Sequence, residues 1–308
     1  MLVITGAGVS TQSGIPDYRG HRGSYHRGHK PMVHDQFMNS HAQRQRYWGR
    51  AMVGWREFDA SQPNEGHAAL TTLERTNRIG VIFDDQPTYH EKDSERWAFG
   101  NGQNRVSIIT QNVDHLHQQA GTNDVTELHG RGSRLRCMSC GAHRDRNDFH
   151  DELEQLNDEW LQSVLSQQEQ EQQELDLDPE EERKLLRPDG DAFVARESYT
   201  DVVVPPCRVC GTGFLKPDVV FFGDNVPKHR IERCKAAVEA ADGLLCIGTS
   251  LAVHSAFRFV RRAHNTQTPI AILNVGETRA EAEGIDNLLK VEAPIGPTLQ
   301  LCAQELLK

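Results

Sequence analysis

Short apolar segments alternate along the chain with longer segments in which apolar residues recur every three or four positions. The short segments are rich in β-branched residues and predict buried strands, whereas the longer ones predict helices with one apolar face. The expected strands are Leu2–Thr5, Arg105–Thr110, Gly243–Ile247, Pro269–Asn274 and the more weakly patterned Leu288–Val291. The expected helices occupy residues 34–57, 64–77, 114–120, 229–241 and 253–264. This alternation predicts an α/β fold with a parallel, doubly wound, Rossmann-like sheet.

Glycines and small polar residues follow most of the expected strands directly. They occur at Gly6–Gly8, Gln111–Asp114, Gly248–Ser250 and Asn274. Ligands of open parallel sheets bind in the crevice at the carboxyl ends of the strands. The sequence therefore predicts that these four segments together form a binding site.

Two Cys-x-x-Cys pairs, Cys137/Cys140 and Cys207/Cys210, interrupt the alternation of strands and helices. Four thiolates complete the tetrahedral coordination of a zinc ion and leave no position for a metal-bound water. We therefore expect one structural Zn²⁺ held by these cysteines. The alternative is two unrelated or redox-active pairs.

The 308 residues are enough for one large and one small domain. We expect a Rossmann-like domain formed by residues 1–130 and 216–308, with residues 131–215 inserted as a small zinc-ribbon module. Within this module, an insertion near residues 150–200 is rich in Gln and Glu, as at Gln167–Glu174 and Asp176–Arg183. That composition predicts a solvated helix or a disordered loop.

The bulk composition narrows the class of protein. A net charge of −10 disfavours nucleic acid as the main ligand, because a polyanion is repelled. No segment approaches the ~18 consecutive apolar residues of a membrane helix. Seven cysteines with two close pairs fit metal binding in a reducing compartment better than disulfides. Since Met1–Ile4 already has the pattern of a first strand, we expect no targeting segment, unless the chain begins inside a longer one.

The glycine-rich loop after the first strand is an incomplete dinucleotide-binding motif, because Thr11 replaces its third glycine. Alone it is a weak signal for a nucleotide. The following segment, Ser13–Arg19, strengthens it, since a proline-containing loop can close over a cofactor. Its Arg19 is suited to a phosphate or ribose and its Asp17 to a polar group. An ordinary surface loop is the alternative.

Polar side chains that suit a nucleotide and a base follow the second expected strand. Gln111, Asn112 and Asp114 offer the amides and the carboxylate that ribose hydroxyls and a carboxamide need, although Asp114 is equally suited to cap a helix. His129 lies between leucine and glycine, well away from the thiols, and is free to act as a general base. A structural histidine is the alternative.

Together these motifs resemble the sirtuins, which are NAD-dependent protein-lysine deacylases. The matching segments follow the family order over nearly the whole chain and are Gly6–Ser10, Ser13–Arg19, Thr110–Asp114, Leu128–Gly130, both cysteine pairs, Lys216–Asp224 and Gly248–Leu251. The insertion near residues 150–200 is the main departure. The segments Arg44–Arg50 and Pro188–Asp191 further resemble the class II branch, closest to the mitochondrial sirtuin four.

The resemblance implies an enzyme that transfers acyl groups from protein lysine to the ADP-ribose part of NAD, giving nicotinamide and O-acyl-ADP-ribose. His129 would be the general base, and Asn112 and Asp114 would hold the nicotinamide ribose and carboxamide side. The implied cofactor-binding residues are Gly6, Ala7, Gly8, Asp17, Tyr18, Arg19, Gln111, Asn112, Asp114, Gly248, Thr249, Ser250, Asn274, Val275 and Ile295. Ile295 is assigned by position alone.

The resemblance also implies a binding segment for the substrate peptide. Val219–Gly223 would be an edge strand that pairs with the peptide by β-augmentation. The carbonyl of Val220 would accept the acyl-lysine N–H, and Phe222, beside Gly223, would line the lysine tunnel. A core strand is the alternative.

Tyr47 and Arg50 bear on the choice of acyl group. At i and i+3 they share one helix face, and they are similar to the Tyr-x-x-Arg pattern with which some class II members recognise an acidic acyl tail. We therefore expect carboxyacyl groups to be preferred over acetyl. The alternative is an ordinary exposed helix surface.

Three other functions remain open. Transfer of ADP-ribose to protein would use the same NAD site. An NAD-linked oxidoreductase with a structural zinc is disfavoured by the incomplete glycine motif. A non-enzymatic zinc-ribbon binding module would leave His129, Asn112 and Asp114 without a role. The resemblance further implies acylated-lysine proteins as partners and the mitochondrial matrix as location, with the cytoplasm as the alternative.

Overall fold

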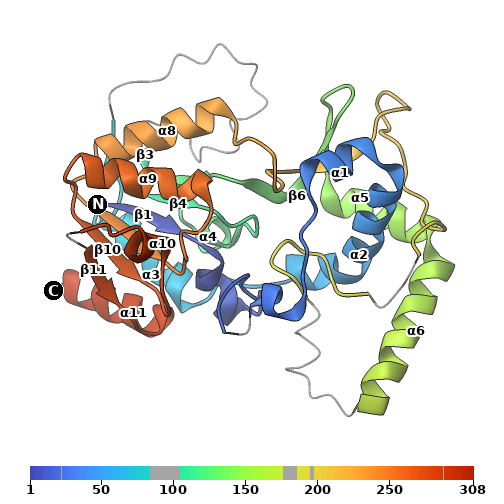
Figure 1. Ribbon diagram of the computed structural model, residues 1–308, viewed down its shortest axis with the longest axis horizontal. Helices are drawn as coiled ribbons and strands as arrows, with labels where there is room; N and C mark the ends of the chain where they lie inside the picture. Colours follow the sequence, from blue (N-terminus) through green and yellow to red (C-terminus); the bar gives the residue numbers. More distant parts are fainter. Residues whose placement is uncertain (22, 84–104, 176–185, 195–197, 287) are drawn as a thin grey trace.

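A six-stranded parallel sheet, in the order β11-β10-β9-β1-β4-β5, forms the centre of the larger of two lobes (Figure 1). The computed structural model describes residues 1–21, 23–83, 105–175, 186–194, 198–286 and 288–308. The strands are β1 (Leu2–Thr5), β4 (Ile108–Thr110), β5 (Val125–Glu127), β9 (Leu244–Ile247), β10 (Ile270–Leu273) and β11 (Leu288–Val291). Because the chain order reverses between β1 and β9, the loops after these strands border one crevice. The predicted doubly wound sheet is confirmed.

Helices cover both faces of this sheet. Alternate strand residues point to opposite faces, so Leu2 and Ile4 pack beneath α8 and α9, whereas Val3 packs against α3 and α11. These helices are α8 (Lys228–Glu239), α9 (His254–Asn265), α3 (Glu65–Arg75) and α11 (Ile295–Leu306), with the short α4 (Leu116–Gln119) and α10 (Arg279–Ala282) beside them. Each fully buried aliphatic side chain contributes about 1.5–3 kcal/mol to this packing.

Helix α11 is absent from the sequence prediction. Its first turn contains Gly296 and Pro297, a pair that normally indicates a turn. Proline is tolerated in the first turn of a helix, where its missing N–H has no partner to lose. Leu299 and Ala303 then pack on the sheet and hold the helix in place.

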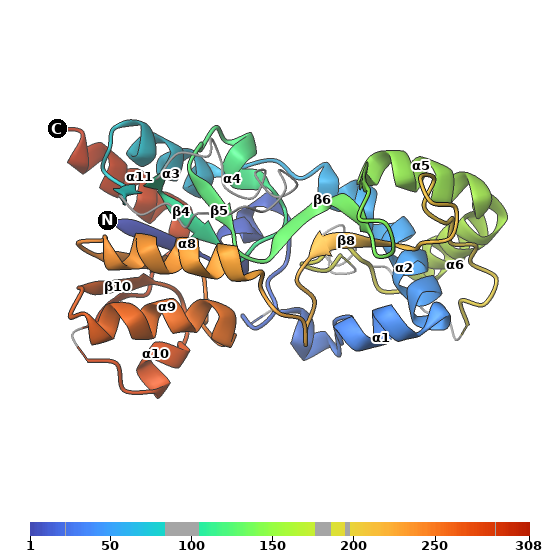
Figure 2. The same cartoon turned by 90° about the horizontal axis from the view of Figure 1, so that it is seen from above.

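The smaller lobe combines helices with a three-stranded antiparallel sheet in the order β7-β6-β8 (Figure 2). Its elements are α1 (His34–Asn39), α2 (His41–Asp59), β6 (Gly130–Cys137), β7 (His143–Asp145), α5 (Arg146–Leu156), α6 (Asp158–Leu175) and β8 (Leu215–Val219). Phe37 and Trp48 of α1 and α2 pack with Phe149 and Leu153 of α5 in one core. Residues 34–59 therefore pack with the cysteine-containing segment, and the predicted domain boundaries at 130 and 216 stay a prediction.

Two predicted elements are each divided by a polar residue. The expected helix 34–57 is broken at Ser40, which is extended and accepts the Gln43 N–H with its Oγ at 3.3 Å, so that α2 begins with a cap. The expected strand Arg105–Thr110 is divided at Ser107 into β3 (Arg105–Val106) and β4, and β3 pairs with β2 (Val81–Ile82).

The glutamine- and glutamate-rich insertion begins as a helix. Residues Gln167–Glu174 belong to α6, which confirms the helical alternative for that part. Asp176–Arg183 lies outside the described residues. Among the helices that the structure describes, none has both the length and the apolar character required to cross a membrane.

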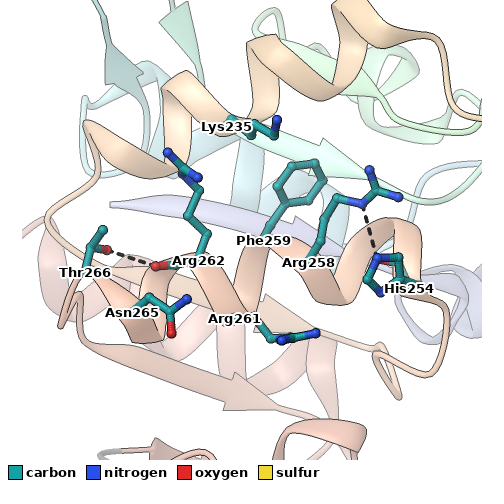
Figure 3. Close-up of a pocket in the computed structure, with 8 residues that line it drawn as sticks. All are labelled: Lys235, His254, Arg258, Phe259, Arg261, Arg262, Asn265 and Thr266. Atoms are coloured by element: carbon teal, nitrogen blue, oxygen red, sulfur yellow. Dashed lines mark hydrogen bonds between the residues drawn. The ribbon is translucent and has the colours of Figure 1, made fainter.

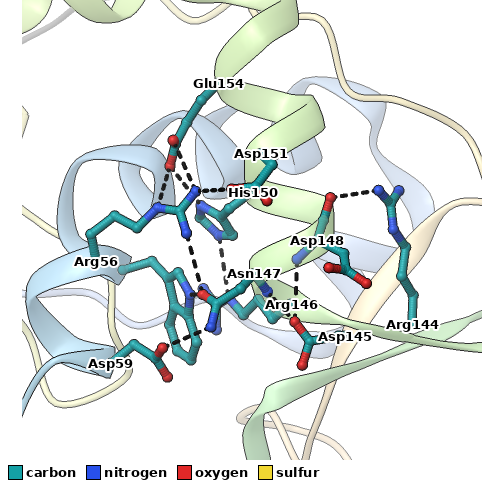
Figure 4. A network of polar contacts seen from close by, with 11 residues as sticks. Arg56, Asp59, Arg144, Asp145, Arg146, Asn147, Asp148, His150, Asp151 and Glu154 are labelled. Atoms are coloured by element: carbon teal, nitrogen blue, oxygen red, sulfur yellow. Dashed lines mark hydrogen bonds and ion pairs between the residues drawn. The ribbon is translucent and has the colours of Figure 1, made fainter.

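A polar network fixes α5 against α2 (Figure 4). Arg56 of α2 donates to Asp151 at 2.6 Å and to Glu154 at 2.9 Å, and Asn147 accepts the indole N–H of Trp55 at 2.7 Å. The exposed ion pairs contribute little individually, since solvent screens them. Their effect is to orient α2, which borders the site described next.

Candidate active site

Three glycines bring the loops after β1 and β9 into direct contact. The Gly8 N–H donates to the Gly248 carbonyl at 2.9 Å. A Cβ on Gly6 would lie 2.7 Å from the Cβ of Thr249, and one on Gly8 would lie 2.9 Å from the Gly248 Cα. Gly248 itself has a φ of +58°, which favours glycine. These glycines therefore close the base of the crevice, a packing role that the sequence analysis did not assign.

A hydrogen-bonded triad connects the two sides of the crevice. Ser10, in the 3₁₀ helix η1 (Ala7–Ser13), donates to Oδ2 of Asp114 at 2.6 Å and accepts from Nδ2 of Asn112 at 3.0 Å. Oδ1 of Asp114 accepts the Leu116 N–H at 3.0 Å, so this residue also serves the start of α4. Burial raises the pKa of Asp114. Ser10 is missing from the predicted site, although it lies in the glycine motif.

His129 is held as a neutral, oriented base. Its Nδ1 lies 2.9 Å from the Gln111 carbonyl, which can only accept, so Nδ1 carries the proton. Its Nε2 therefore has a free lone pair and accepts from the Ser255 hydroxyl at 2.8 Å. Burial lowers the pKa of His129 to about 4. A hydroxyl that replaces Ser255 could give its proton to Nε2, which is what a general base requires.

Ser255 is a second residue that the sequence analysis missed. It lies in the first turn of α9, shortly after the predicted segment Gly248–Ser250. Oγ1 of Thr249 in that segment accepts a hydrogen bond from Nε2 of Gln111 at 2.9 Å and another from the Leu251 N–H at 3.0 Å. The Gln111 and Thr249 side chains therefore join the loops after β4 and β9.

The segment predicted to cover a cofactor is folded around two tyrosines. Asp17 accepts the Gly20 N–H at 2.7 Å, and Tyr18 packs against Tyr25 with 5.4 Å between ring centroids. Burial raises the pKa of Tyr18, which keeps the phenol neutral. Arg19 is exposed and lies over the Tyr25 ring at 4.9 Å. Its guanidinium is therefore accessible to an anionic ligand.

The remaining predicted cofactor residues lie at the same edge of the sheet. Asn274 follows β10 and donates from Nδ2 to the Val275 carbonyl at 2.9 Å, and the Val275 side chain is exposed. Ile295 begins α11, and its Cδ1 lies 2.9 Å from the position that a Gly248 Cβ would take. The structure thus brings Ile295 against the second glycine loop.

The predicted peptide-binding segment adjoins His129. β8 lies at the edge of its sheet but ends at Val219, so the predicted strand Val219–Gly223 shares only its first residue with β8. Beyond it, Phe222 forms an isolated bridge with Val33, and the edge-strand role of residues 220–223 stays a prediction. The Val220 N–H donates to the His129 carbonyl at 2.8 Å, and the Phe222 carbonyl accepts the His34 N–H at 2.9 Å. Phe222 is partly exposed, and Gly223 turns the chain with a φ of +83°.

Tyr47 and Arg50 are buried, so the alternative of an exposed helix surface is wrong. Tyr47 packs against Phe37 and Phe221. Arg50 is paired within the protein: Nη2 lies 2.8 Å from Oδ2 of Asp191, and Nε donates to the Ala192 carbonyl at 3.1 Å. A free guanidinium, as carboxylate binding requires, is not what the structure shows.

Replacing Arg50 with methionine is expected to lower the free energy of unfolding by about 3–5 kcal/mol, because Asp191 is left buried without its main partner. Urea denaturation measures the change. Arg56→Met, which removes an exposed arginine of the same helix, is the matched control. Adding Asp191→Asn to Arg50→Met is expected to recover part of the loss. An Arg50→Met change as small as that of the control would contradict a buried ion pair.

The four predicted cysteines form one cluster. The Sγ atoms of Cys137 and Cys210 are 3.8 Å apart, as are those of Cys140 and Cys207, and all four lie within 4.8 Å of one another. Tetrahedral zinc–thiolate bonds of about 2.3 Å put the sulfurs about 3.8 Å apart. The arrangement fits a single structural zinc site shared by both pairs, as predicted.

A separate hollow of about 390 Å³ lies between α8 and α9 and contains none of the predicted site residues (Figure 3). Its lining is mainly cationic, with Lys235, Arg258, Arg261 and Arg262. It is therefore distinct from the crevice at the glycine loops.

Comparisons with known proteins identify the family. The family model described as the Sir2 family matches residues 6–86 and 97–255. The chain belongs to the Sir2 family. The predicted resemblance to the sirtuins is thereby confirmed at the level of the family.

Curated relatives match along most of this Sir2 family chain. The "NAD-dependent protein deacetylase 2" of Bradyrhizobium diazoefficiens is 40% identical over 281 residues, 91% of this chain and 86% of the relative. The "NAD-dependent protein deacetylase" of Xanthomonas axonopodis pv. citri is 41% identical, over 99% of this chain and 85% of the relative. The "NAD-dependent protein deacylase Sirt4" of Drosophila melanogaster is 38% identical, over 91% of this chain and 76% of the relative.

Solved structures share the fold. A Sir2–p53 peptide–NAD⁺ complex superposes with a TM-score of 0.64 at 23% identity, covering 99% of this chain and 92% of that one. Another Sir2 enzyme structure gives a TM-score of 0.65, covering 99% and 91%. The Rossmann-like α/β architecture of this chain is therefore that of Sir2 enzymes.

Proposed function

We propose that the protein is an NAD-dependent protein-lysine deacylase that produces nicotinamide and O-acyl-ADP-ribose. The observation that carries this proposal is the neutral, half-buried His129, whose Nδ1 is held by the Gln111 carbonyl, whose Nε2 lone pair accepts from Ser255, and whose carbonyl accepts the Val220 N–H. The names of the curated relatives, all NAD-dependent deacetylases or deacylases, support it.

The residues of the crevice fit NAD. Glycine loops that approach closely, an exposed arginine and the amide and carboxylate of Asn112 and Asp114 offer partners for phosphate, ribose and carboxamide. When bound, NAD supplies the ADP-ribose that accepts the acyl group and loses nicotinamide. Arg19 offsets phosphate charge, and Asn112 and Asp114 orient the ribose.

The protein groups that handle the substrate are His129 and the segment after β8. We propose that His129 accepts at Nε2 the proton of the attacking ribose hydroxyl, which takes the place of Ser255, while the Gln111 carbonyl keeps Nδ1–H in position. No described donor occupies the Val220 carbonyl, so it is available to an acyl-lysine N–H, with Phe222 beside it. The four cysteines would hold zinc with no open coordination position, so zinc takes no part in the acyl transfer.

The finer identity is also a proposal. We propose membership of the class II branch near the sirtuin-four type, which the Drosophila relative and the segments Arg44–Arg50 and Pro188–Asp191 support. A mitochondrial location would follow from that branch, although bacterial relatives match as well. Tyr47 and Arg50 would contact a carboxyacyl group only if Asp191 released Arg50.

The test is mass spectrometry of lysine peptides that carry acetyl, succinyl, glutaryl, methylglutaryl or lipoyl groups, incubated with enzyme and NAD. Loss of an acyl group, matched by nicotinamide and O-acyl-ADP-ribose, is the expected result. Nicotinamide release with every acyl group intact would instead indicate ADP-ribose transfer or NAD hydrolysis. If the peptides were unchanged and NAD had no effect, the non-enzymatic binding module would be the remaining alternative.

A further inference from the structure

Two buried histidines lie beneath the crevice and have no place in the mechanism above. His67 of α3 and His117 of α4 are 0% and 1% exposed, and their ring centroids are 4.8 Å apart in an edge-to-face arrangement. Burial lowers the pKa of His67 to about 4 and that of His117 well below its usual range. Both rings are therefore neutral at physiological pH, and each carries one proton.

The hydrogen bonds determine which nitrogen carries each proton. The Asn64 N–H donates to Nδ1 of His67 at 3.3 Å, so the proton of His67 is on Nε2. The Thr5 hydroxyl donates its single proton to Oγ1 of Thr110 at 2.9 Å. Nε2 of His117 lies 2.9 Å from the same Thr5 oxygen and must therefore be the donor in that contact, which leaves Nδ1 of His117 as an acceptor.

These assignments make the two rings complementary. Nε2–H of His67 is a buried donor and Nδ1 of His117 a buried acceptor, and neither has another partner among the described residues. Buried polar atoms are nearly always paired. These two atoms are unpaired in the part of the chain that the structure describes, so the inference requires that a bridging water or a rotation of one ring joins them. The series of hydrogen bonds from Asn64 through His67, His117 and Thr5 to Thr110 then runs in one direction from donor to acceptor.

Both ends of this chain of hydrogen bonds, Asn64 and Thr110, reach the crevice. At one end, Nδ2 of Asn64 donates to the Val9 carbonyl at 2.8 Å and to Oγ of Ser13 at 2.9 Å, both in η1. At the other end, Oγ1 of Thr110 accepts the Asn112 N–H at 3.1 Å. The series of hydrogen bonds thus connects the loop that contains Ser10 with the turn that contains Asn112. The hydrogen bonds of Ser10 to Asn112 and Asp114 connect the same two segments a second time.

We propose that Thr5 and His117 are positioning residues for the deacylation proposed above, on which this inference rests. They fix the turn that begins at Asn112 relative to η1, so that the Asn112 and Asp114 side chains meet NAD in one geometry. Hydrogen bonds in a buried, low-dielectric environment reinforce one another, which makes such a chain stiff. A stiff support matters because small misplacements at a reacting centre cost large factors in rate.

The kinetic test removes one hydroxyl from the chain. Thr5→Val deletes the link and keeps the volume, whereas Thr5→Ser keeps the link. Thr278→Val is the matched control, since it removes a buried threonine hydroxyl that donates to Glu281 at 2.9 Å and contacts no member of the chain. We expect Thr5→Val to lower kcat about tenfold, Thr5→Ser to restore it, and Thr278→Val to lose comparable stability with kcat unchanged. Equal kcat losses in both valine variants, or no loss in either, would overturn the inference.

A spectroscopic test needs neither substrate nor NAD. In ¹⁵N-histidine-labelled protein, we expect both His67 and His117 to be protonated on Nε2, with the pKa of His67 near 4 and that of His117 well below its ordinary value. Thr5→Val is expected to shift the His117 signals. A His117 proton on Nδ1, or titration near pH 6.5, would break the chain and the inference. An inactive wild type would overturn the proposed function itself, whereas an active wild type with an unaffected Thr5→Val variant overturns only the positioning role.

Discussion

Replacing His129 with alanine is expected to lower the rate of acyl removal by about 100- to 10,000-fold, the usual contribution of a general base. NAD binding is expected to stay largely intact, because the glycine loops and the Ser10, Asn112 and Asp114 contacts do not involve the imidazole. Mass spectrometry of acylated peptides measures the rate, and calorimetric titration with NAD measures the binding.

The matched control for this change is Ser255→Ala. It removes the hydroxyl that donates to Nε2 but leaves the ring and its bond to the Gln111 carbonyl. If the lone pair of Nε2 is the working atom, Ser255→Ala retains most of the activity that His129→Ala loses. Turnover that survives in His129→Ala would remove this residue as the base, and a joint loss of NAD binding would return it to a structural role.

The second large effect is expected at the cysteine cluster. Cys207→Ser is expected to unfold the smaller lobe, because structural zinc sites contribute on the order of 10 kcal/mol to folding. Cys137 and Cys207 belong to the same buried core as Trp48 and Phe149, so the loss extends into α2. Zinc content by elemental analysis and thermal melting by circular dichroism measure both parts of this prediction.

Cys302→Ser is the control for the zinc prediction. Cys302 is exposed on α11 and lies outside the cluster. Its replacement is expected to change neither zinc content nor the melting temperature. A Cys207→Ser protein that melts like the Cys302→Ser protein would show that metal does not hold the smaller lobe together.

Much of the fold could be predicted because its determinants are local. The expected strand Leu2–Thr5 has the bounds of β1, and Gly243–Ile247 differs from β9 by one residue. Buried parallel strands are continuous apolar runs, which a sequence shows directly. Helix α11 was not predicted, because Gly296 and Pro297 indicate a turn. Packing of the helix against the sheet outweighs that local preference.

The site was predictable only as far as its motifs extend. His129 and the glycine loops stand in recognisable segments, but the partner of the His129 lone pair, Ser255, is 126 positions away. The same holds for Arg50, whose Asp191 partner is 141 positions distant in the segment treated as an insertion. Such pairs arise from the tertiary fold, and no local pattern announces them.

Strand β6 connects the cysteine cluster of the smaller lobe to the general base His129. It begins at Gly130, directly after His129, and ends at the zinc ligand Cys137, spanning the gap between the lobes (Figure 2). Eight residues of strand cover about 27 Å. β6 pairs with β8 at both of its ends, Gly130 with Val219 and Cys137 with Leu215, although the register shifts between Arg131 and Leu135. One pair of strands therefore extends from the backbone beside His129 to the cysteine cluster, so loss of the cluster is expected to free the far end of the strand that follows the base.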